Sequence, residues 1–397
     1  MSLSSEIVIL EGARTPMAEY NGSFSDVSAI DLGVVAAREA LARSATDPAE
    51  VDHVIFGNAL QTSGDAIYGA RHVGLKAGIP KEVPALTVNR LCGSGFESII
   101  QGAQRILLGE ATTVLAGGME NMSQAPHVIR GARRGLRLGQ GQLEDSLMVA
   151  LLDSWCGLCM AQTSDRVAAK YGISRREQDE YALSSQRRAA AAWESCRISE
   201  EVVGVDVKAG RKAVRVDRDD HMRPDTTIEA LTKLPPSFGK DGQVTAGNAS
   251  GIVDGAAAVV VTTAENARRK GTKPLGRLVS WAVVGCDPEL MGLGPAPAAV
   301  EALEKAGLSK EDVDLWEINE AFAGQILGVV RELGLDLAEL NVNGGAIALG
   351  HPLAATGTRL TLTLLKELRR RGARYGLAGA CIGGGQGIAV VLESTAS

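Results

Sequence analysis

Apolar runs along the chain alternate with segments that carry apolar residues at helical spacing. Residues 6–10 and 52–56 have the pattern of buried strands, and residues 30–42 have that of an amphipathic helix. Strands that alternate with helices are typical of mainly parallel sheets with helices on both faces and right-handed crossovers. The sequence therefore predicts an α/β fold.

The same helix-then-strand order recurs in the C-terminal half, from Pro297 onward. A constant shift of 262 positions, the separation between Asn89 and His351, aligns the two halves without a gap over about eighty positions. This shift also places Gly95 on Gly357. Self-similarity at one fixed offset is the signature of a duplicated unit, so we expect two related α/β halves whose equivalent loops meet in a cleft.

The first half carries an insertion. It runs 138 positions from Gly117 to Gly255, whereas the second runs only 8 positions from Gly379 to Gly387, so the first contains about 130 additional residues. A helical pattern covers residues 163–193 of this insertion. The predicted units are an N-terminal core half of residues 1–120 and 247–270, an inserted loop domain of residues 121–246, and a C-terminal core half of residues 271–397.

Cys92 lies where an apolar run meets a helical pattern. It is followed by Gly93, Ser94 and Gly95, and apolar residues from Phe96 onward recur at helical spacing. A helix N-terminus favours the thiolate, the nucleophilic form of cysteine, so a lowered pKa is expected for this thiol. A buried structural cysteine at a glycine-rich helix start is the alternative interpretation.

The second half supplies three further reactive positions. Asn319 follows a buried strand, and Cys381 precedes a glycine cluster. His351 stands within three residues of the position equivalent to Cys92 and precedes a helix over residues 359–370. Because equivalent loops converge, these groups would share one pocket suited to nucleophilic catalysis with acid–base partners. A histidine before a proline is also common in turns, where its ring makes only structural hydrogen bonds.

The composition narrows the class of protein. The chain has 397 residues, of which 45% are apolar and 22% charged, as in an ordinary soluble protein. Its net charge of −6 argues against nucleic acid as the main partner. The basic residues 130–137 fit a solvated loop, an anionic ligand or a subunit contact.

Cysteine usage and the chain start bear on location. Six cysteines in a chain of this length do not form a disulfide framework and indicate a reducing compartment. Residues 1–6 lack the pattern of a signal peptide, and no apolar run approaches the ~18 residues of a membrane span. We therefore expect a cytoplasmic protein that does not contact membranes.

No metal site is predicted. Cys156 and Cys159 have the spacing of zinc ligands or a redox pair, but no second pair or histidine cluster follows, so we interpret the spacing as accidental. The sequence contains no phosphate-binding Gly-Lys-Ser/Thr loop, no Gly-x-Gly-x-x-Gly and no His-Glu-x-x-His.

Several segments, in the same order, resemble the signature of the thiolase family. They are residues 89–95 (NRLCGSG), 245–251 (TAGNASG), 292–295 (GLGP), 319–322 (NEAF), 350–352 (GHP) and 381–387 (CIGGGQG). Residues 88–96 and 143–147 are most similar to 3-ketoacyl-CoA thiolases of the mitochondrial type. The resemblance spans nearly the whole chain and implies duplicated α/β halves that form a five-layered α-β-α-β-α core, with an inserted loop domain.

The resemblance implies a CoA-dependent acyltransferase that cleaves 3-ketoacyl-CoA with CoA into acyl-CoA and acetyl-CoA, or condenses acetyl-CoA in reverse. Cys92 would form the acyl-enzyme, His351 would deprotonate it, and Cys381 would exchange the proton next to the thioester. His351 with a water held by Asn319 would form one oxyanion site. The backbone N–H groups of Cys92 and Gly383 would form the other.

By the same resemblance, the inserted domain holds CoA, a co-substrate, and no cofactor is bound permanently. Ser250 would contact the pantetheine arm and Arg223 the adenosine phosphates, although an ordinary surface arginine is an equal alternative for Arg223. Leu151, Met160 and Phe238 correspond to residues that line the acyl and pantetheine tunnel. The resemblance also implies a homodimer or homotetramer, assembled through the inserted domain.

Three positions depart from the family's pattern. Ala354 and Thr356 stand where a glycine and a serine are common, which adds methyl groups near the nucleophile and bears on packing and acyl size. Cys159 stands where acetoacetyl-CoA thiolases often carry a histidine, which argues against a dedicated acetoacetyl-CoA enzyme.

Other functions fit parts of the pattern. A ketosynthase-like condensing enzyme typically pairs one cysteine with two histidines or with a histidine and an asparagine, so Cys381 argues against it. A non-catalytic acyl-CoA-binding protein on the same fold needs no reactive groups, and the set that argues against it is Cys92, Asn319, His351 and Cys381. A redox protein that uses the two cysteines at 156 and 159 is a third alternative.

Overall fold

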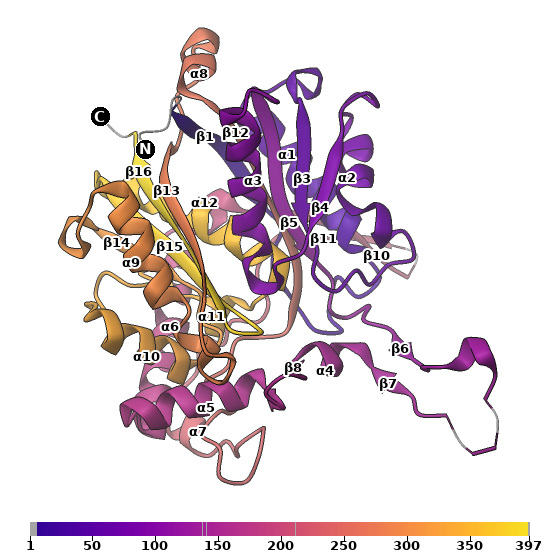
Figure 1. The fold of residues 1–397 in the computed structure, drawn as a ribbon, viewed down its shortest axis with the longest axis vertical. Helices are drawn as coiled ribbons and strands as arrows, with labels where there is room; N and C mark the ends of the chain where they lie inside the picture. Colours follow the sequence, from indigo (N-terminus) through magenta and orange to yellow (C-terminus); the bar gives the residue numbers. More distant parts are fainter. Residues whose placement is uncertain (1–5, 137, 140, 211, 396–397) are drawn as a thin grey trace.

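The computed structural model describes residues 6–136, 138–139, 141–210 and 212–395, and within them ten strands form one continuous sheet (Figure 1). In spatial order the strands are β14 (Leu315–Ile318), β15 (Tyr375–Ile382), β16 (Gln386–Ser394), β13 (Gly276–Gly285), β1 (Ile7–Arg14), β12 (Val253–Thr263), β5 (Thr113–Glu120), β3 (His53–Gly57) and β4 (Ala85–Val88), with β2 (Ala18–Glu19) paired to β12. The helices of the two halves are α1 (Ala29–Arg43), α2 (Gly69–Ala77), α3 (Ser94–Leu107), α8 (Ala264–Lys270), α9 (Pro295–Ala306), α10 (Ala323–Leu333), α11 (Ala346–Leu349) and α12 (Leu353–Arg371).

Three apolar cores separate five layers of structure. The first core lies between α1 and α2 and the N-terminal strands of the sheet. The second lies between the two halves of the sheet and contains the inner helices α3 and α12. The third lies between the C-terminal strands and the outer helices α9 and α10. The five-layered α-β-α-β-α core implied by the resemblance is therefore confirmed.

The duplication is also visible in the elements. The short 3-10 helix η1 (Pro48–Glu50) recurs as η7 (Lys310–Asp312), and β5 recurs as β15, each displaced by the same 262 positions that relate the two halves of the sequence. The halves are joined where β1 pairs antiparallel with β13, Ile7 opposite Leu278. Their separate sheets thus become one.

The inner helices α3 and α12 cross at a pair of glycines that the repeat relates to each other. A Cβ atom on Gly95 would lie 2.6 Å from the backbone nitrogen of Thr358, and one on Gly357 would lie 2.3 Å from that of Phe96. Only glycine permits this approach of two backbones. The crossing holds the N-terminal ends of the two helices side by side.

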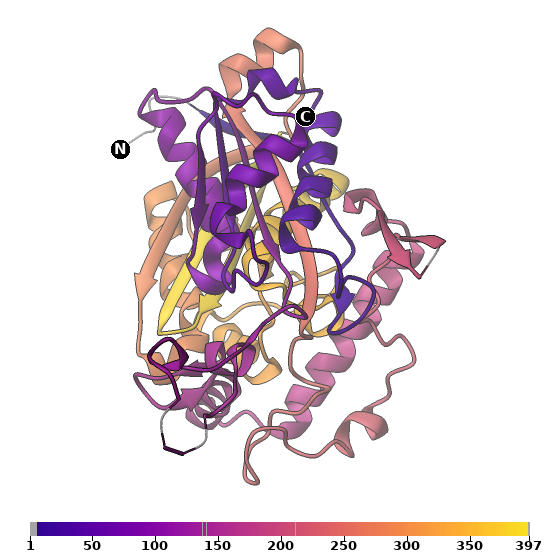
Figure 2. The same cartoon turned by 90° about the vertical axis from the view of Figure 1, so that its right-hand side faces the viewer.

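Residues 121–246 contribute no strand to the large sheet within the part of the chain that the structure describes. Figures 1 and 2 show the helices of this segment, magenta to pink, across the lower end of the molecule. The elements are β6 (His127–Val128), β7 (Glu144–Asp145), α4 (Ser146–Ala150), β8 (Leu152–Asp153), β9 (Leu158–Cys159), α5 (Met160–Tyr171), α6 (Arg175–Glu194), β10 (Val205–Ala209), β11 (Lys212–Val216) and α7 (Ile228–Thr232). The division of the chain into three domains stays a prediction.

The helical pattern over residues 163–193 corresponds to two helices, not one. α5 ends at Gly172, which adopts the left-handed conformation with φ 59°, and α6 starts after Ser174, whose side chain caps it. A glycine at this position ends a helix because it adopts positive φ without steric cost. Apolar spacing continues across the break, so it conceals the turn.

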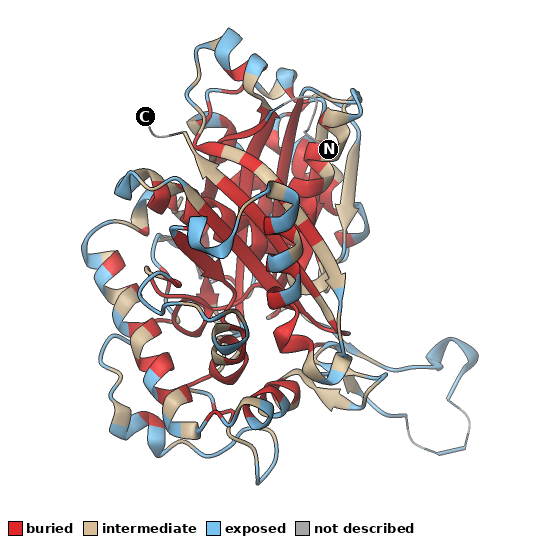
Figure 3. Ribbon diagram, turned by 60° about the vertical axis from the view of Figure 1, so that its left-hand side comes forward, coloured by how far each residue is buried: buried red, intermediate tan, exposed pale blue. Residues whose placement is uncertain are grey.

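An arm formed by β6, β7 and the loop between them projects from the body of the molecule. Figure 3 shows it almost wholly exposed, in contrast to the buried sheet. The basic segment predicted at 130–137 lies on this arm, with Arg130, Arg133 and Arg134 around a 3-10 turn, while residue 137 lies outside the described residues. Within the described chain, no helix combines the length and the apolarity needed to cross a bilayer.

Candidate active site

Cys92 lies in a turn of 3-10 helix, η3 (Leu91–Gly93), that joins β4 to α3. Leu91 has a φ of 47°, a conformation that is costly for a non-glycine residue and clusters at functional turns. The hydroxyl of Ser94 holds the turn, since it accepts from the N–H of Arg90 at 2.8 Å and donates to the carbonyl of Leu91 at 2.7 Å. The cysteine therefore starts a helix, as the sequence predicts.

Burial dominates the electrostatics of this thiol. It raises the pKa of Cys92 to about 11, while the backbone N–H groups of Gly383 and of Cys92 itself act to lower it and the carboxylate of Glu120 acts to raise it. The expected lowering of the pKa is therefore wrong for the free protein. The cost of desolvating a thiolate outweighs the stabilisation by the N–H groups at the helix start.

The ring of His351 is held at both nitrogens. Nδ1 lies 2.6 Å from Oγ1 of Thr356, and Nε2 lies 3.3 Å from Nδ2 of Asn319. The Thr356 hydroxyl donates to the carbonyl of Pro352 at 3.1 Å, so it accepts from Nδ1 and leaves Nε2 as the basic nitrogen. Burial and then the charge of Arg359 lower the pKa of the ring to about 3, which keeps it neutral.

The backbone before His351 is fixed by the N-terminal half. Gly350 has a φ of 91°, and a Cβ atom there would lie 2.3 Å from the side chain of Val253 on β12. The N–H of His351 donates to the carbonyl of Gly251 at 2.9 Å. The N-terminal half of the molecule thus positions the histidine that the C-terminal half supplies.

Asn319 and Cys381 lie at the ends of the parallel strands β14 and β15. Oδ1 of Asn319 is buried and has no hydrogen-bond partner among the described residues. Cys381 is buried, and burial followed by its proximity to Cys92 and Cys286 raises the pKa of its thiol well above the usual value. The site thus holds two neutral thiols beside a neutral imidazole.

Contacts link the five predicted catalytic positions only in part. Asn319 contacts His351 directly, the N–H of Gly383 faces the thiol of Cys92, and Cys92 acts electrostatically on Cys381. No hydrogen bond joins His351 to Cys92 among the described side chains. Such contacts often tighten only when substrate binds.

Glu320 supports the site through hydrogen bonds, and the sequence analysis assigned it no role of its own. Its carboxylate accepts from the hydroxyls of Tyr181 at 2.9 Å and Ser185 at 2.7 Å, from Nδ2 of Asn341 at 3.0 Å and from the N–H of Ile347 at 3.1 Å. It thereby ties α6 of the insertion to the segment before the histidine. Its place beside an active-site asparagine was the available signal.

Glu120 is a second buried carboxylate that the sequence did not single out. It accepts from Nδ2 of Asn58 at 2.9 Å and from the N–H groups of Leu60 at 3.0 Å, Ala59 at 3.1 Å and Ala354 at 3.1 Å. Burial raises its pKa to about 7 despite these donors. It attaches the start of α12 to the other half, and no sequence signal identifies it beyond an acidic residue in a buried strand.

Thr356 is the third residue with an unexpected contact. From the sequence it is a packing change near the nucleophile, yet its hydroxyl bonds the ring of His351. A hydroxyl that follows a histidine by five residues, across a helix start, was the only available signal.

Leu151 and Met160, the residues predicted to line a tunnel, lie together beside the thiols, and their contact with a ligand stays a prediction. The N–H of Met160 donates to the carbonyl of Leu151 at 3.0 Å. Leu151 packs in an apolar cluster with Cys92, and Met160 packs in another with Cys381. A Cβ atom on Gly383 would lie 3.2 Å from the sulfur of Met160, so the two side chains form one wall of the site.

The other three predicted coenzyme residues are spread more widely. Ser250 lies next to the site, where its N–H donates to the carbonyl of Ala321 at 3.0 Å. Arg223 lines a groove of about 360 Å³ together with Leu231 and other residues, and neither Ser250 nor Phe238 belongs to that lining. Phe238 is half-buried in the loop after α7.

Comparisons with known proteins agree with this arrangement. The sequence profile of the thiolase N-terminal domain matches residues 7–265, and that of the thiolase C-terminal domain matches residues 272–394. The chain is 53% identical over 397 residues to the mitochondrial 3-ketoacyl-CoA thiolase of Homo sapiens, with 100% of both chains covered. It is 47% identical over 389 residues to an acetyl-CoA acetyltransferase of Pseudomonas aeruginosa, which covers 98% of this chain and 99% of that protein.

Solved structures give the same result. The crystal structure of human mitochondrial 3-ketoacyl-CoA thiolase superposes with a TM-score of 0.97 at 53% identity and covers 100% of both chains. A structure of that human enzyme in complex with CoA gives the same values. The acetyl-CoA acetyltransferase of Bacillus anthracis also gives a TM-score of 0.97, at 42% identity and with 99% of this chain and 100% of that chain covered.

The relatives named as mitochondrial contradict the expectation of a cytoplasmic protein. That expectation rested partly on the free cysteines, which indicate a reducing compartment without distinguishing one such compartment from another. The two profiles together span both core halves and the insertion, in the order that the resemblance requires. The chain belongs to the thiolase family.

Proposed function

We propose that the protein is an acetyl-CoA C-acyltransferase, which cleaves 3-ketoacyl-CoA with CoA into acyl-CoA and acetyl-CoA and, in reverse, condenses acetyl-CoA. One observation carries the proposal: the thiol of Cys92 faces the N–H of Gly383, with the His351–Asn319 pair supplied from the same half as Gly383. Relatives named 3-ketoacyl-CoA thiolase and acetyl-CoA acetyltransferase support the two directions.

In the first half-reaction, Cys92 attacks the keto carbon of the substrate and its proton passes to Nε2 of His351. The bond between C2 and C3 then breaks, and its electron pair forms the enolate of acetyl-CoA. Cys381 protonates C2 of this enolate, so acetyl-CoA leaves and Cys381 is left as a thiolate. Cys92 is left as the thioester of the shortened acyl group.

In the second half-reaction, free CoA gives its thiol proton to the Cys381 thiolate and attacks the acyl-enzyme. Cys92 leaves the tetrahedral intermediate and recovers its proton from His351. Both residues return to the neutral forms that burial favours in the free protein. The raised pKa of the thiol therefore fits a nucleophile that loses its proton only during attack.

Two sets of donors stabilise the developing oxyanions. The backbone N–H groups of Cys92 and Gly383 both point at the Cys92 sulfur. The oxygen of the thioester formed on that sulfur becomes negative next to these two donors. On the other side, Oδ1 of Asn319 has no hydrogen-bond partner within the described chain and suits a bound water, which would serve the keto oxygen together with His351.

CoA is the co-substrate, and no cofactor is bound permanently in this proposal. The inserted domain, residues 121–246, holds most of the coenzyme: Leu151 and Met160 line the acyl and pantetheine path beside the thiols. Ser250 contacts the pantetheine arm, and Arg223 contacts the adenosine phosphates. Phe238 lines the same tunnel as Leu151 and Met160.

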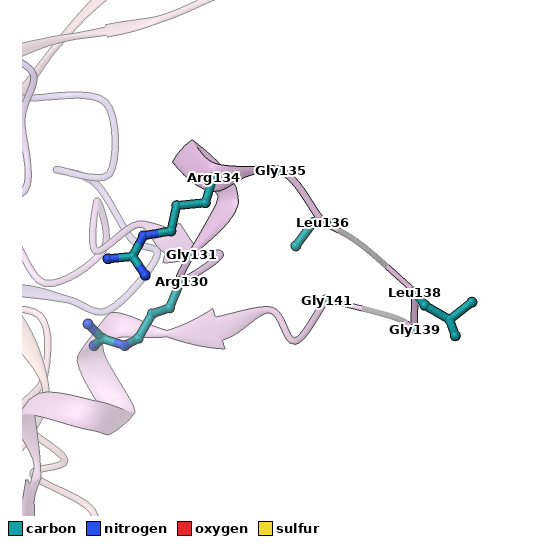
Figure 4. Close-up of a pocket in the computed structure, with 8 residues that line it drawn as sticks. All are labelled: Arg130, Gly131, Arg134, Gly135, Leu136, Leu138, Gly139 and Gly141. Atoms are coloured by element: carbon teal, nitrogen blue, oxygen red, sulfur yellow. The ribbon is translucent and has the colours of Figure 1, made fainter.

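The proposed assembly is a homodimer or homotetramer formed through the inserted domain. Its arm carries exposed apolar side chains, among them Leu136 and Leu138. Figure 4 shows Leu138 pointing away from the arm, whereas the side chains of the basic Arg130 and Arg134 extend in the opposite direction. Apolar residues that project on an arm into solvent favour a contact with another subunit. A monomeric mass in light scattering would contradict this assembly.

The decisive experiment measures CoA-dependent cleavage of acetoacetyl-CoA and of longer 3-ketoacyl-CoAs. Cys92→Ala removes the nucleophile, and we expect cleavage to fall to the detection limit. Cys196→Ala, which removes an exposed cysteine, is the matched control and leaves the rate unchanged. Cleavage by Cys92→Ala at the wild-type rate would sink the proposal and restore the non-catalytic alternative.

A further inference from the structure

Glu19 lies at the groove that contains Arg223. One carboxylate oxygen, Oε2, lies 2.9 Å from Nη2 of Arg223 and 3.3 Å from Nδ1 of His221. The ring of His221 packs over Gly251, next to the proposed pantetheine contact Ser250. A single acidic side chain thus bonds the arginine and lies beside the histidine on this side of the groove.

The backbones on both sides of this contact are fixed. Glu19 belongs to β2, where it pairs with Val253 on β12, and its N–H donates to Asp220 at 2.6 Å. The N–H of Arg223 donates to Oε1 of Gln186 on α6 at 2.8 Å. The carboxylate therefore stays within reach of the arginine, whether or not the two side chains are paired.

The side chains themselves are open to solvent. Arg223 is 59% exposed and Glu19 is 38% exposed, so their pairing adds little to the stability of the fold. The pairing instead affects how strongly a ligand binds Arg223. An anion that binds Arg223 at Nη2 has to displace the carboxylate, which then remains close to the bound negative charge.

We propose that Glu19 sets the affinity for the nucleotide end of the coenzyme: its carboxylate holds Arg223 and is displaced by a phosphate group of CoA. The inference rests on the proposed function, because it takes CoA as the ligand of this groove. Glu19 thereby lowers the affinity for CoA and favours release of CoA thioesters.

The test is calorimetric titration with CoA, with dephospho-CoA, which lacks the 3′-phosphate, and with pantetheine, which lacks every phosphate. Glu19→Gln keeps the shape of the side chain and removes its charge, and Glu19→Ala is a second variant in case the first is poorly folded. We expect Glu19→Gln to bind CoA about threefold to fivefold more tightly at low salt, with the gain reduced at high salt. Pantetheine affinity stays unchanged.

Two further variants separate the possible outcomes. In an Arg223→Gln background, removal of the Glu19 charge is expected to give less than half of that gain, since the displaced partner is gone. Glu110→Gln, which removes a surface carboxylate paired with Arg105 at the end of α3 remote from the site, controls for net charge and binds CoA like the wild type.

The outcomes distinguish this inference from the proposed function. If Glu19→Gln binds CoA no more tightly than the wild type, while the wild type still cleaves 3-ketoacyl-CoA, the inference on Glu19 is wrong and the function stands. If the gain is the same for pantetheine as for CoA, displacement by a phosphate is also wrong. If the wild-type protein neither binds CoA nor cleaves the substrate, both proposals fail.

Discussion

Oγ1 of Thr356 lies 2.6 Å from Nδ1 of His351, while the same hydroxyl donates to the carbonyl of Pro352. A hydroxyl that already donates elsewhere accepts from the ring, so the proton of the neutral imidazole is on Nδ1. Nε2 is then the nitrogen that accepts a proton, and it is the one beside Asn319. Thr356 therefore acts as a positioning residue that selects the tautomer of the histidine.

The first prediction concerns Thr356→Val, which keeps the shape of the side chain and removes the hydroxyl. The Nδ1–H of His351 loses its acceptor inside a buried site, which costs about 1–3 kcal/mol. We expect kcat for cleavage to fall by about five- to 150-fold. Steady-state kinetics and ¹⁵N NMR of the imidazole check the rate and the tautomer.

Thr356→Ser is the matched control for this substitution, since it removes the methyl and keeps the hydroxyl. It is expected to retain most of the activity and the Nδ1–H tautomer. Equal kinetics and an unchanged imidazole spectrum in Thr356→Val would show that the hydroxyl does not position the ring.

The second prediction separates the two thiols of the site. Cys381→Ala removes the group proposed to move the proton at C2 and leaves Cys92 in place. Exchange of the methyl protons of acetyl-CoA with solvent deuterium should fall by about 10²- to 10⁴-fold, as expected when a general base is lost. Alkylation of Cys92 by iodoacetamide, followed by mass spectrometry, should persist. Proton exchange at the wild-type rate would assign this step to another residue.

The third prediction is a pH dependence of stability. Burial raises the pKa of Glu120 from 4.5 to about 7, so the folded state keeps a proton that the unfolded chain loses above about pH 4.5. The associated stability is present below pH 4.5 and is lost as pH rises through 7. Relative to Glu120→Gln, the wild-type free energy of unfolding should decline by about 3 kcal/mol over this window.

Denaturant titrations of both proteins at several pH values check this difference. Other groups with shifted pKa, such as His351, are present in both proteins and cancel in the comparison. A difference that stays constant from pH 4.5 to 8 would mean that Glu120 is ionised throughout, with its N–H donors outweighing burial.

The duplication was predictable from the sequence because a repeat and an insertion both change the number of residues between equivalent positions. One fixed offset placed His351 opposite Asn89, three residues before the nucleophile, and the structure shows the two loops at the N-terminal ends of crossing helices. The motifs around Cys92 and Cys381 then identified the family. These inferences need only the order of residues along the chain.

The supporting residues were not predictable in the same way. Glu120 and Ala354 are 234 positions apart, and Glu320 meets Ser185 across 135 positions, so their contacts exist only in the folded chain. The prediction of a lowered pKa for Cys92 was wrong for a related reason. Helix position is visible in sequence, whereas the burial that outweighs it depends on packing by residues from the other half and the insertion.

The last prediction concerns the crossing of α3 and α12. In Gly95→Ala, the new methyl group would lie 2.6 Å from the backbone nitrogen of Thr358 and 2.7 Å from the carbonyl of Ala354. Both are backbone atoms, so the helices must separate, which should lower the free energy of unfolding by about 1–3 kcal/mol. Activity should fall as well, because the reactive loops precede these helices. Gly64→Ala is the control and should be neutral in urea titrations, because no atom of the described residues would lie within 4 Å of its new methyl group. Equal stability of both variants would contradict close backbone contact at the crossing.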